Sequence, residues 1–328
     1  MRHTWFTHNS VSSAYFSSKL GNAQCSSPPN RANDRPEEKN DKNCEYPAHL
    51  CDNLSWRVSG LGKAYSSPRS PLIGRPIQME GQAKGAYVNI ISCDVTHIEA
   101  ASKMVEEATE SNGSVYALFC CAGAAVPGFF MQQTPRICAD QMNLNYLGVV
   151  NCIHPAVQNM IEHKTRGRLV IVSSTLGLMG LVGYSQYSAT KFALRGLAES
   201  LRQELLPHGI RAHIYFVATI NTPGNRRENE LKPAITKKIE EGDISDDSPA
   251  SRASILLRGV LLDEFAISSD PITCLFLAAS LGACPGSTNV FRDILLIPLA
   301  HWMLTLWRNY ADWLVLRAAA TKTNSIQN

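Results

Sequence analysis

From residue 86 onward, short apolar runs alternate with longer segments of helical hydrophobic spacing, and this alternation limits the folds that the chain can adopt. Apolar runs predict buried strands at residues 87–92, 116–120, 168–173 and 211–216, with a short strand near 265–268. Helices are predicted at residues 98–111, 139–163 and 186–206. Strands that alternate with helices in this way pair in parallel. The pattern therefore predicts an α/β fold with a Rossmann-like, doubly wound parallel sheet.

Shifts in composition divide the chain into three predicted parts. Residues 1–85 are polar and rich in Ser, Asn, Pro and Arg, which predicts a disordered or atypical N-terminal segment. The first strand–helix units of the fold are therefore expected to be atypical or missing. Residues 86–290 carry the α/β pattern and form the main domain. Residues 291–328 form an apolar tail.

The apolar tail is predicted to contact a membrane surface. Its nearly uncharged stretch, residues 294–306, is shorter than the roughly twenty apolar residues of a spanning helix. Arg308 and Asp312 follow, and charged side chains are costly in lipid. Tryptophan and tyrosine residues between 302 and 313 suit a membrane interface. We expect a membrane-associated hairpin or an interfacial helix, with a dimer or core helix as the alternative.

The charge and cysteine content exclude several other classes of function. A net charge of +3, with 18% charged residues and no dense Lys/Arg stripe, argues against a nucleic-acid partner. The ten cysteines lack the paired spacing of a zinc site, so no metal is expected. Together with the lack of a secretory signal pattern, they predict reduced thiols in a cytosol-facing protein.

Tyr187 and Lys191 form a Y-x-x-x-K pair in the predicted helix 186–206, and Ser174 lies thirteen residues before Tyr187, where a predicted strand ends. Residues at i and i+4 share one face of a helix. A lysine ammonium one turn away favours a phenolate and draws the pKa of a tyrosine from about 10 toward neutrality. The three residues therefore predict a proton-transfer site for a carbonyl or an alcohol. Since no side chain supplies a hydride, a nicotinamide cofactor is expected.

Three further motifs occur in an order that resembles the short-chain dehydrogenase/reductase superfamily: C-D-V at 93–95, C-C-A-G at 120–123 and N-x-x-G at 145–148. The resemblance implies a catalytic tetrad of Asn145, Ser174, Tyr187 and Lys191. In it, Tyr187 gives the proton, Lys191 tunes Tyr187 and holds the ribose, Ser174 orients the substrate oxygen, and Asn145 anchors a proton-relay water. The implied cofactor-binding residues are Asp94, Val95, Ala122, Gly123, Tyr187, Lys191 and Thr222.

Within the superfamily, one branch is resembled most, the 3-ketosphinganine (3-ketodihydrosphingosine) reductases. The resemblance is carried by residues 119–123, 127–130, 193–204, 214–216, 222–224 and 235–239. This branch implies reduction of 3-ketosphinganine to sphinganine in sphingolipid biosynthesis, with NADPH as cofactor and a long-chain sphingoid base as substrate. It also implies a location at the cytosolic face of the endoplasmic reticulum membrane. The sequence leaves open whether the protein forms a homo-oligomer.

Two departures from the superfamily pattern keep alternatives open. Val217 and Ala218 stand where the superfamily usually has Pro-Gly. No T-G-x-x-x-G-x-G turn precedes Asp94, although such a turn brings backbone amides to the cofactor pyrophosphate. The alternatives are a steroid- or retinoid-type carbonyl reductase of the same superfamily, a non-catalytic remnant that lacks cofactor binding, or a mistaken start over residues 1–85.

Overall fold

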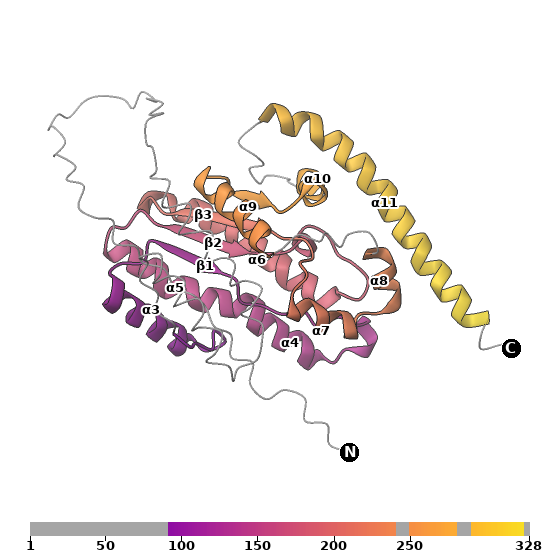
Figure 1. Cartoon of the computed structure of the whole chain (residues 1–328), viewed down its shortest axis with the longest axis horizontal. Helices are drawn as coiled ribbons and strands as arrows, with labels where there is room; N and C mark the ends of the chain where they lie inside the picture. The colour runs from indigo at the N-terminus through magenta and orange to yellow at the C-terminus, as the bar shows by residue number, and fades with distance from the viewer. Residues whose placement is uncertain (1–90, 241–248, 281–289, 325–328) are drawn as a thin grey trace, which may run out of the picture.

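A parallel sheet lies at the centre of the protein, seen in a computed structural model that describes residues 91–240, 249–280 and 290–324 (Figure 1). Its strands, in spatial and chain order, are β1 (Ala117–Cys120), β2 (Arg168–Val172), β3 (Arg211–Phe216) and β4 (Ala266–Ser268). Every described pair of neighbouring strands is parallel. The predicted parallel sheet is therefore confirmed. Of the first predicted strand, residues 87–90 lie outside the described part of the chain, and Ile91 and Ser92 belong to no strand.

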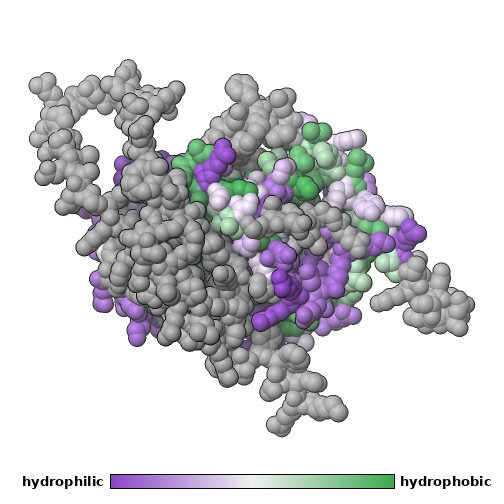
Figure 2. All heavy atoms as spheres, in the orientation of Figure 1, coloured by the Kyte–Doolittle hydropathy of each residue, from purple (hydrophilic) through white to green (hydrophobic). Residues whose placement is uncertain are grey.

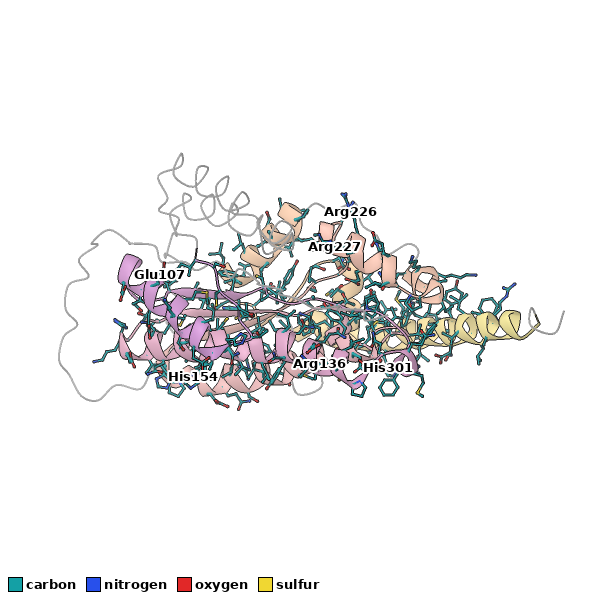
Figure 3. All side chains as sticks on the ribbon, turned by 90° about the horizontal axis from the view of Figure 1, so that it is seen from below. Glu107, Arg136, His154, Arg226, Arg227 and His301 are labelled. Carbon is teal, nitrogen blue, oxygen red and sulfur yellow. The ribbon has the colours of Figure 1, made fainter. Side chains whose placement is uncertain are left out.

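Helices cover both faces of this sheet. They include α3 (Ile98–Asn112), α5 (Gly148–Glu162), α6 (Ser185–Glu204), α9 (Pro249–Leu261) and α10 (Pro271–Ser280). Successive strand residues point to opposite faces. Leu169 and Ile171 of β2 join the core cluster that contains residues of α3, α5 and α6, whereas Val170 between them packs in a second cluster with α9. In Figure 3, α5, which carries His154, lies on the opposite side of the sheet from Arg226 and Arg227.

The predicted helix 139–163 is divided by a wider turn. It consists of α4 (Pro135–Met142), a π-helical turn (Asn143–Leu147) and α5. Pro135 starts α4 earlier than predicted because proline is well suited to the first turn of a helix. The π-helical turn contains Asn145, and π-helical turns frequently occur at functional sites. The chain is helical without a break from Pro135 to Glu162, so the predicted long helix is confirmed, but the π-helical turn within it was not predicted.

Three further helices complete the described chain: α7 (Pro223–Leu231), α8 (Ala234–Glu240) and α11 (Val290–Asn324). Helix α11 contacts α10 through an edge-on ring pair, Phe276 and Trp307, whose centroids lie 5.4 Å apart. Ala300, Ala311 and Leu314 of α11 are buried. The tail is thus helical and packs on the main domain. Among the described residues, no helix combines the length and apolar character that a membrane crossing requires.

Candidate active site

Tyr187 and Lys191 lie one turn apart on α6. Lys191 Nζ lies 5.5 Å from the centre of the Tyr187 ring and donates a hydrogen bond to the Val172 carbonyl at the end of β2, at 3.2 Å. Lys191 is only 5% exposed, whereas Tyr187 is partly exposed. The sheet therefore holds the lysine beneath the tyrosine ring, while the ring keeps access to solvent.

The buried Asn145 side chain joins the π-helical turn to two other segments. Its Oδ1 atom accepts a hydrogen bond from the Ala124 amide at 2.8 Å, and its Nδ2 atom donates to the Ala124 carbonyl at 2.9 Å. Nδ2 also donates to the Thr190 hydroxyl at 3.0 Å, which in turn donates to the Tyr187 carbonyl at 2.8 Å. Asn145 thus fixes the loop after β1 and the turn of α6 that carries Tyr187 relative to one another.

Gly123 lies against both Asn145 and Lys191. A Cβ atom at this position would lie 3.0 Å from Asn145 Oδ1 and 3.5 Å from Lys191 Nζ. A side chain here would therefore crowd the space beside the lysine ammonium, where a cofactor ribose is expected. The missing side chain at Gly123 and the ammonium next to it fit a nicotinamide cofactor at this end of the site.

Ser174 follows β2 and begins a short 3-10 turn, Thr175–Gly177. Its Oγ atom accepts a hydrogen bond from the Leu176 amide at 3.2 Å, which leaves its hydroxyl hydrogen available to donate. The preceding residue, Ser173, is buried and donates to the Lys191 carbonyl at 3.2 Å. The end of β2 is therefore anchored to the same turn of α6 that carries the Tyr187–Lys191 pair.

Asp94 and Val95 are tied mainly to the start of α3 and to α5. Asp94 Oδ1 accepts hydrogen bonds from the Thr96 amide at 3.0 Å and the Thr96 hydroxyl at 2.7 Å. Val95 is fully buried, and its carbonyl accepts a hydrogen bond from Asn151 at 2.9 Å. An added Cβ at Gly148 would lie 2.8 Å from Val95 Cγ2. Asp94 is half-buried at the position where an adenine is expected, and its contact with the cofactor stays a prediction.

Ala122 and Thr222 complete the expected cofactor contacts. Ala122 is partly buried and packs against the core beside Gly123. The Thr222 hydroxyl accepts a hydrogen bond from the Asn225 amide at 3.1 Å and so caps α7. The structure thus places Gly123, Asn145 and Lys191 together, while it ties Thr222 to the start of α7. The roles of Ala122 and Thr222 stay predictions.

Burial controls the charge of the groups beside the tyrosine. Removal from water lowers the pKa of Lys191 from 10.5 to about 8. The neighbouring Cys121 stands where the superfamily usually has asparagine. Burial raises the pKa of its thiol to about 12, against the opposing effect of the Lys191 ammonium. At neutral pH the thiol is therefore uncharged, and Lys191 remains the cation of the site.

Tyr184 lies beside Tyr187, with ring centroids 6.0 Å apart. Its hydroxyl donates a hydrogen bond to the Glu228 carboxylate on α7. Lys232 Nζ lies 3.9 Å from that carboxylate and 2.5 Å from a carboxylate oxygen of Glu240 on α8. This cluster holds α7 and α8 against the residues that lead into α6, next to Tyr187.

Several residues that support the site were not found by sequence reasoning. Thr190 lies three residues after Tyr187 on α6, so its helical spacing was a usable signal. Ser173 adjoins Ser174 and was visible only as the last residue of an apolar run. Glu228 gave no signal, because a single acid in a polar helix resembles any solvent-exposed residue.

Comparison with known proteins agrees with this geometry. The family model for short chain dehydrogenase matches residues 74–232. A 3-ketodihydrosphingosine reductase of Dictyostelium discoideum is 36% identical over 234 residues, which cover 70% of each chain. The chain belongs to the short-chain dehydrogenase/reductase superfamily. The resemblance read from the motifs is thus confirmed, as is the expectation of an oxidoreductase that uses a nicotinamide cofactor.

The named relatives belong to one branch of this superfamily. A 3-ketodihydrosphingosine reductase of Cryptococcus neoformans is 32% identical, covering 77% of this chain and 80% of its own. A 3-dehydrosphinganine reductase of Danio rerio is 31% identical, covering 65% and 72%. A short chain dehydrogenase/reductase from Burkholderia phymatum, solved in complex with NAD, has a TM-score of 0.55 at 18% identity, covering 66% of this chain and 85% of its own. That structural likeness supports the fold.

Proposed function

We propose that this protein reduces the ketone of 3-ketodihydrosphingosine to the alcohol, as the names of its relatives describe for those proteins. The observation that carries the proposal is the buried Lys191 ammonium beneath the Tyr187 ring, held next to Gly123 and Asn145. This arrangement supports proton transfer to an oxygen close to a bound nicotinamide. When bound, the reduced nicotinamide supplies the hydride that adds to the carbonyl carbon.

In this proposal, each residue of the tetrad has one task. The Tyr187 hydroxyl gives its proton to the ketone oxygen, and the Lys191 ammonium stabilises the phenolate that remains. The Ser174 hydroxyl donates a hydrogen bond that orients the same oxygen. Asn145 holds the surrounding backbone in place through Ala124 and Thr190.

We further propose NADPH as the hydride donor, supported by the similarity to reductases that the names of the relatives describe. The two nicotinamide cofactors differ by one phosphate on the adenosine ribose. Parallel turnover measurements with NADPH and NADH test this choice. Turnover that favours NADH at equal concentration would contradict it.

We also propose that α11 holds the protein at a membrane surface, with the cytosolic face of the endoplasmic reticulum as the location. Support comes from exposed apolar residues at alternating spacings of four and three: Leu299, Met303, Leu306, Tyr310 and Trp313. The exposed polar residues His301, Arg308 and Asp312 lie on a different side of the helix. In Figure 2, green residues alternate with pale and purple ones where α11 runs in Figure 1. An amphipathic helix of this kind suits the interface between water and lipid.

The test uses the purified full chain with detergent-dispersed 3-ketodihydrosphingosine and NADPH at high concentration. We expect dihydrosphingosine, detected by mass spectrometry, with matching loss of NADPH absorbance. A panel of steroid and retinoid ketones forms the comparison. Faster turnover of a steroid or retinoid ketone would favour the alternative, a steroid- or retinoid-type carbonyl reductase. No turnover of any ketone would favour a non-catalytic remnant.

A further inference from the structure

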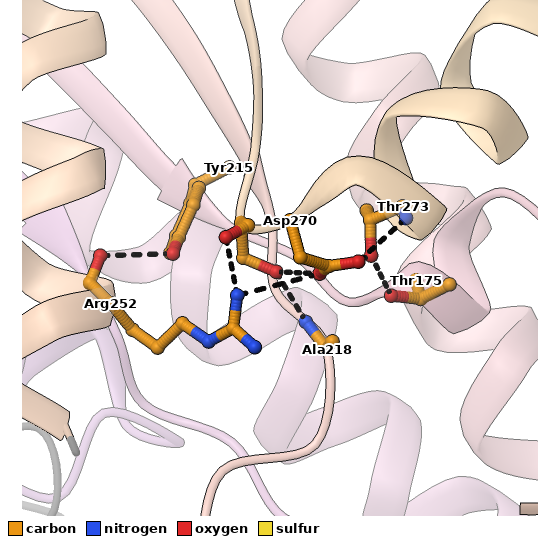
Figure 4. A network of polar contacts seen from close by, with 7 residues as sticks. Thr175, Tyr215, Ala218, Arg252, Asp270 and Thr273 are labelled. Atoms are coloured by element: carbon orange, nitrogen blue, oxygen red, sulfur yellow. Dashed lines mark hydrogen bonds and ion pairs between the residues drawn. The ribbon is translucent and has the colours of Figure 1, made fainter. Parts of the chain in front are cut away.

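A buried polar network connects the segments that follow β2, β3 and β4 (Figure 4). Its members are Thr175, Tyr215, Ala218, Arg252, Ser269, Asp270 and Thr273. Ser269 and Thr273 are each 1% exposed. Ligands of such sheets bind beyond the carboxyl ends of the strands, so the network lies at the functional edge of the sheet.

The Asp270 carboxylate is the centre of this network. Its Oδ1 atom accepts a hydrogen bond from the Thr273 amide at 2.8 Å, which caps α10. Its Oδ2 atom accepts hydrogen bonds from the Thr273 hydroxyl at 2.7 Å and the Ser269 hydroxyl at 2.5 Å. The Arg252 guanidinium lies 3.6 Å from Oδ2. A helix cap needs only the first of these contacts, so the second oxygen has a separate role.

Each of the two hydroxyl groups extends the network toward the active site. Thr273 Oγ1 lies 2.9 Å from Thr175 Oγ1. Because Thr273 gives its only hydroxyl hydrogen to Asp270, Thr175 must be the donor in that contact. Ser269 likewise donates to Asp270 and accepts a hydrogen bond from the Ala218 amide at 2.9 Å. The carboxylate thus determines the direction of both hydrogen-bond chains.

The ends of these chains adjoin residues of the site. Thr175 directly follows Ser174, and its amide donates to the Val217 carbonyl at 3.1 Å. Val217 and Ala218 lead toward Thr222, the residue expected at the nicotinamide. They also stand where the superfamily usually has Pro-Gly, so this segment relies on its own contacts for its position.

We propose that Asp270 is a positioning residue, which fixes the Ser174 loop and the segment after β3 relative to each other through Thr273 and Ser269. The inference rests on the proposed reductase site, to which it adds a residue that touches neither substrate nor cofactor. Burial alone would raise the pKa of Asp270, but hydrogen bonds from Ser269 and Thr273 and the charge of Arg252 lower the pKa below its usual value. The carboxylate is therefore ionised at neutral pH, as two hydroxyl donors require.

The most selective variant is Thr175→Val, because it removes one hydroxyl and leaves the α10 cap and the Arg252 contact intact. We expect kcat to fall on the order of tenfold, with little change in KM or thermal midpoint, because Ser174 is misplaced rather than lost. Thr175→Ser keeps the hydroxyl and should restore most of kcat. A folded Thr175→Val protein with wild-type kcat would overturn the proposal.

A second measurement needs no activity. Hydrogen exchange of the amides of Leu176, Gly177 and Leu178, without substrate or cofactor, reports the order of the Ser174 loop. We expect faster exchange there in Thr175→Val. In Asp270→Asn, whose single amide oxygen cannot accept from both hydroxyls and from the Thr273 amide as the carboxylate does, exchange should also rise around Ala218. Unchanged exchange in Thr175→Val would refute the positioning role, even if Asp270→Asn fails to fold.

The two measurements separate this inference from the proposed function. If the wild-type chain reduces no ketone while Thr175→Val loosens the Ser174 loop, the proposed function fails and the positioning role stands. If wild-type turnover is present and neither kcat nor exchange changes in Thr175→Val, the proposed function stands and the positioning role fails.

Discussion

At the scale of single residues, Lys191 holds a positive charge where burial opposes it. Its pKa is about 8 in the folded protein and 10.5 in the unfolded chain. The unfolded chain therefore binds the proton more tightly, and charging this lysine destabilises the fold. In the proposed mechanism this charge stabilises the Tyr187 phenolate, so the cost in stability is expected to serve function.

The Lys191→Met variant should separate stability from activity. Below pH 8 the buried charge destabilises the folded wild-type protein to its full extent. The variant should therefore unfold at a higher urea concentration, with a free energy of unfolding up to ~3 kcal/mol larger than that of the wild type. As pH rises from about 8 to 10.5, the folded wild-type protein loses the proton first and the gain should shrink toward zero. Urea unfolding of both proteins at pH 7 and pH 10 measures the difference in the free energy of unfolding. An equal difference at the two pH values would contradict the lowered pKa of Lys191.

The Tyr187→Phe variant should abolish turnover while the fold stays intact. It removes only the hydroxyl that gives the proton, and general acid catalysis contributes roughly 100- to 10,000-fold. Initial rates with saturating substrate test this, with circular dichroism as the check on folding. Tyr15 opens a second Y-x-x-x-K match at residues 15–19 and provides the matched control, because Tyr15→Phe should leave the rate unchanged. More than a tenth of wild-type turnover in Tyr187→Phe would rule out its role.

At the scale of elements, local patterns predicted the sheet and α6 well. β2 and β3 alternate between two buried faces, and Tyr187 and Lys191 lie on the helix that their spacing required. The π-helical turn at Asn145 could not be predicted, because it depends on contacts with Ala124 and Thr190, far away in sequence. Asp270 was missed for the same reason, since its link to Thr175 spans about 95 residues.

The exposed apolar side of α11 leads to a prediction about membrane binding. Leu306→Glu combined with Trp313→Glu places two charges on that side, while the buried residues that pack on α10 stay unchanged. We expect the variant to leave the membrane fraction in vesicle flotation, because each buried charge is costly at the interface. His301→Glu with Thr305→Glu adds the same number of charges on the polar side and should float like wild type. If both variants float equally, the apolar side of α11 does not bind the membrane.

At the scale of the whole molecule, cofactor affinity depends on residues far from the tetrad. The sequence lacks the glycine-rich turn before Asp94, and losing several hydrogen bonds to a charged pyrophosphate, at about 1.5–3 kcal/mol each, weakens binding by several powers of ten. We therefore expect the full chain to bind NADPH in roughly the millimolar range. Fluorescence titration measures this affinity, with NADH as the comparison. Micromolar binding would mean that residues 1–85 supply a phosphate site of another kind.

The π-helical turn also determines which side chains of α5 face the core, because it rotates α5 about the helix axis relative to α4. Within the turn, the Asn145 side chain hydrogen-bonds the loop after β1. Directly after the turn, Gly148 packs against Val95, beside the position expected for adenine. One residue corresponds to about 100° of rotation in an α-helix. Deleting a single residue from the turn would swing either Asn145 away from Ala124 or Gly148 away from Val95. One extra residue in one helix thus allows the catalytic end and the adenine end of the cofactor site to be aligned at the same time.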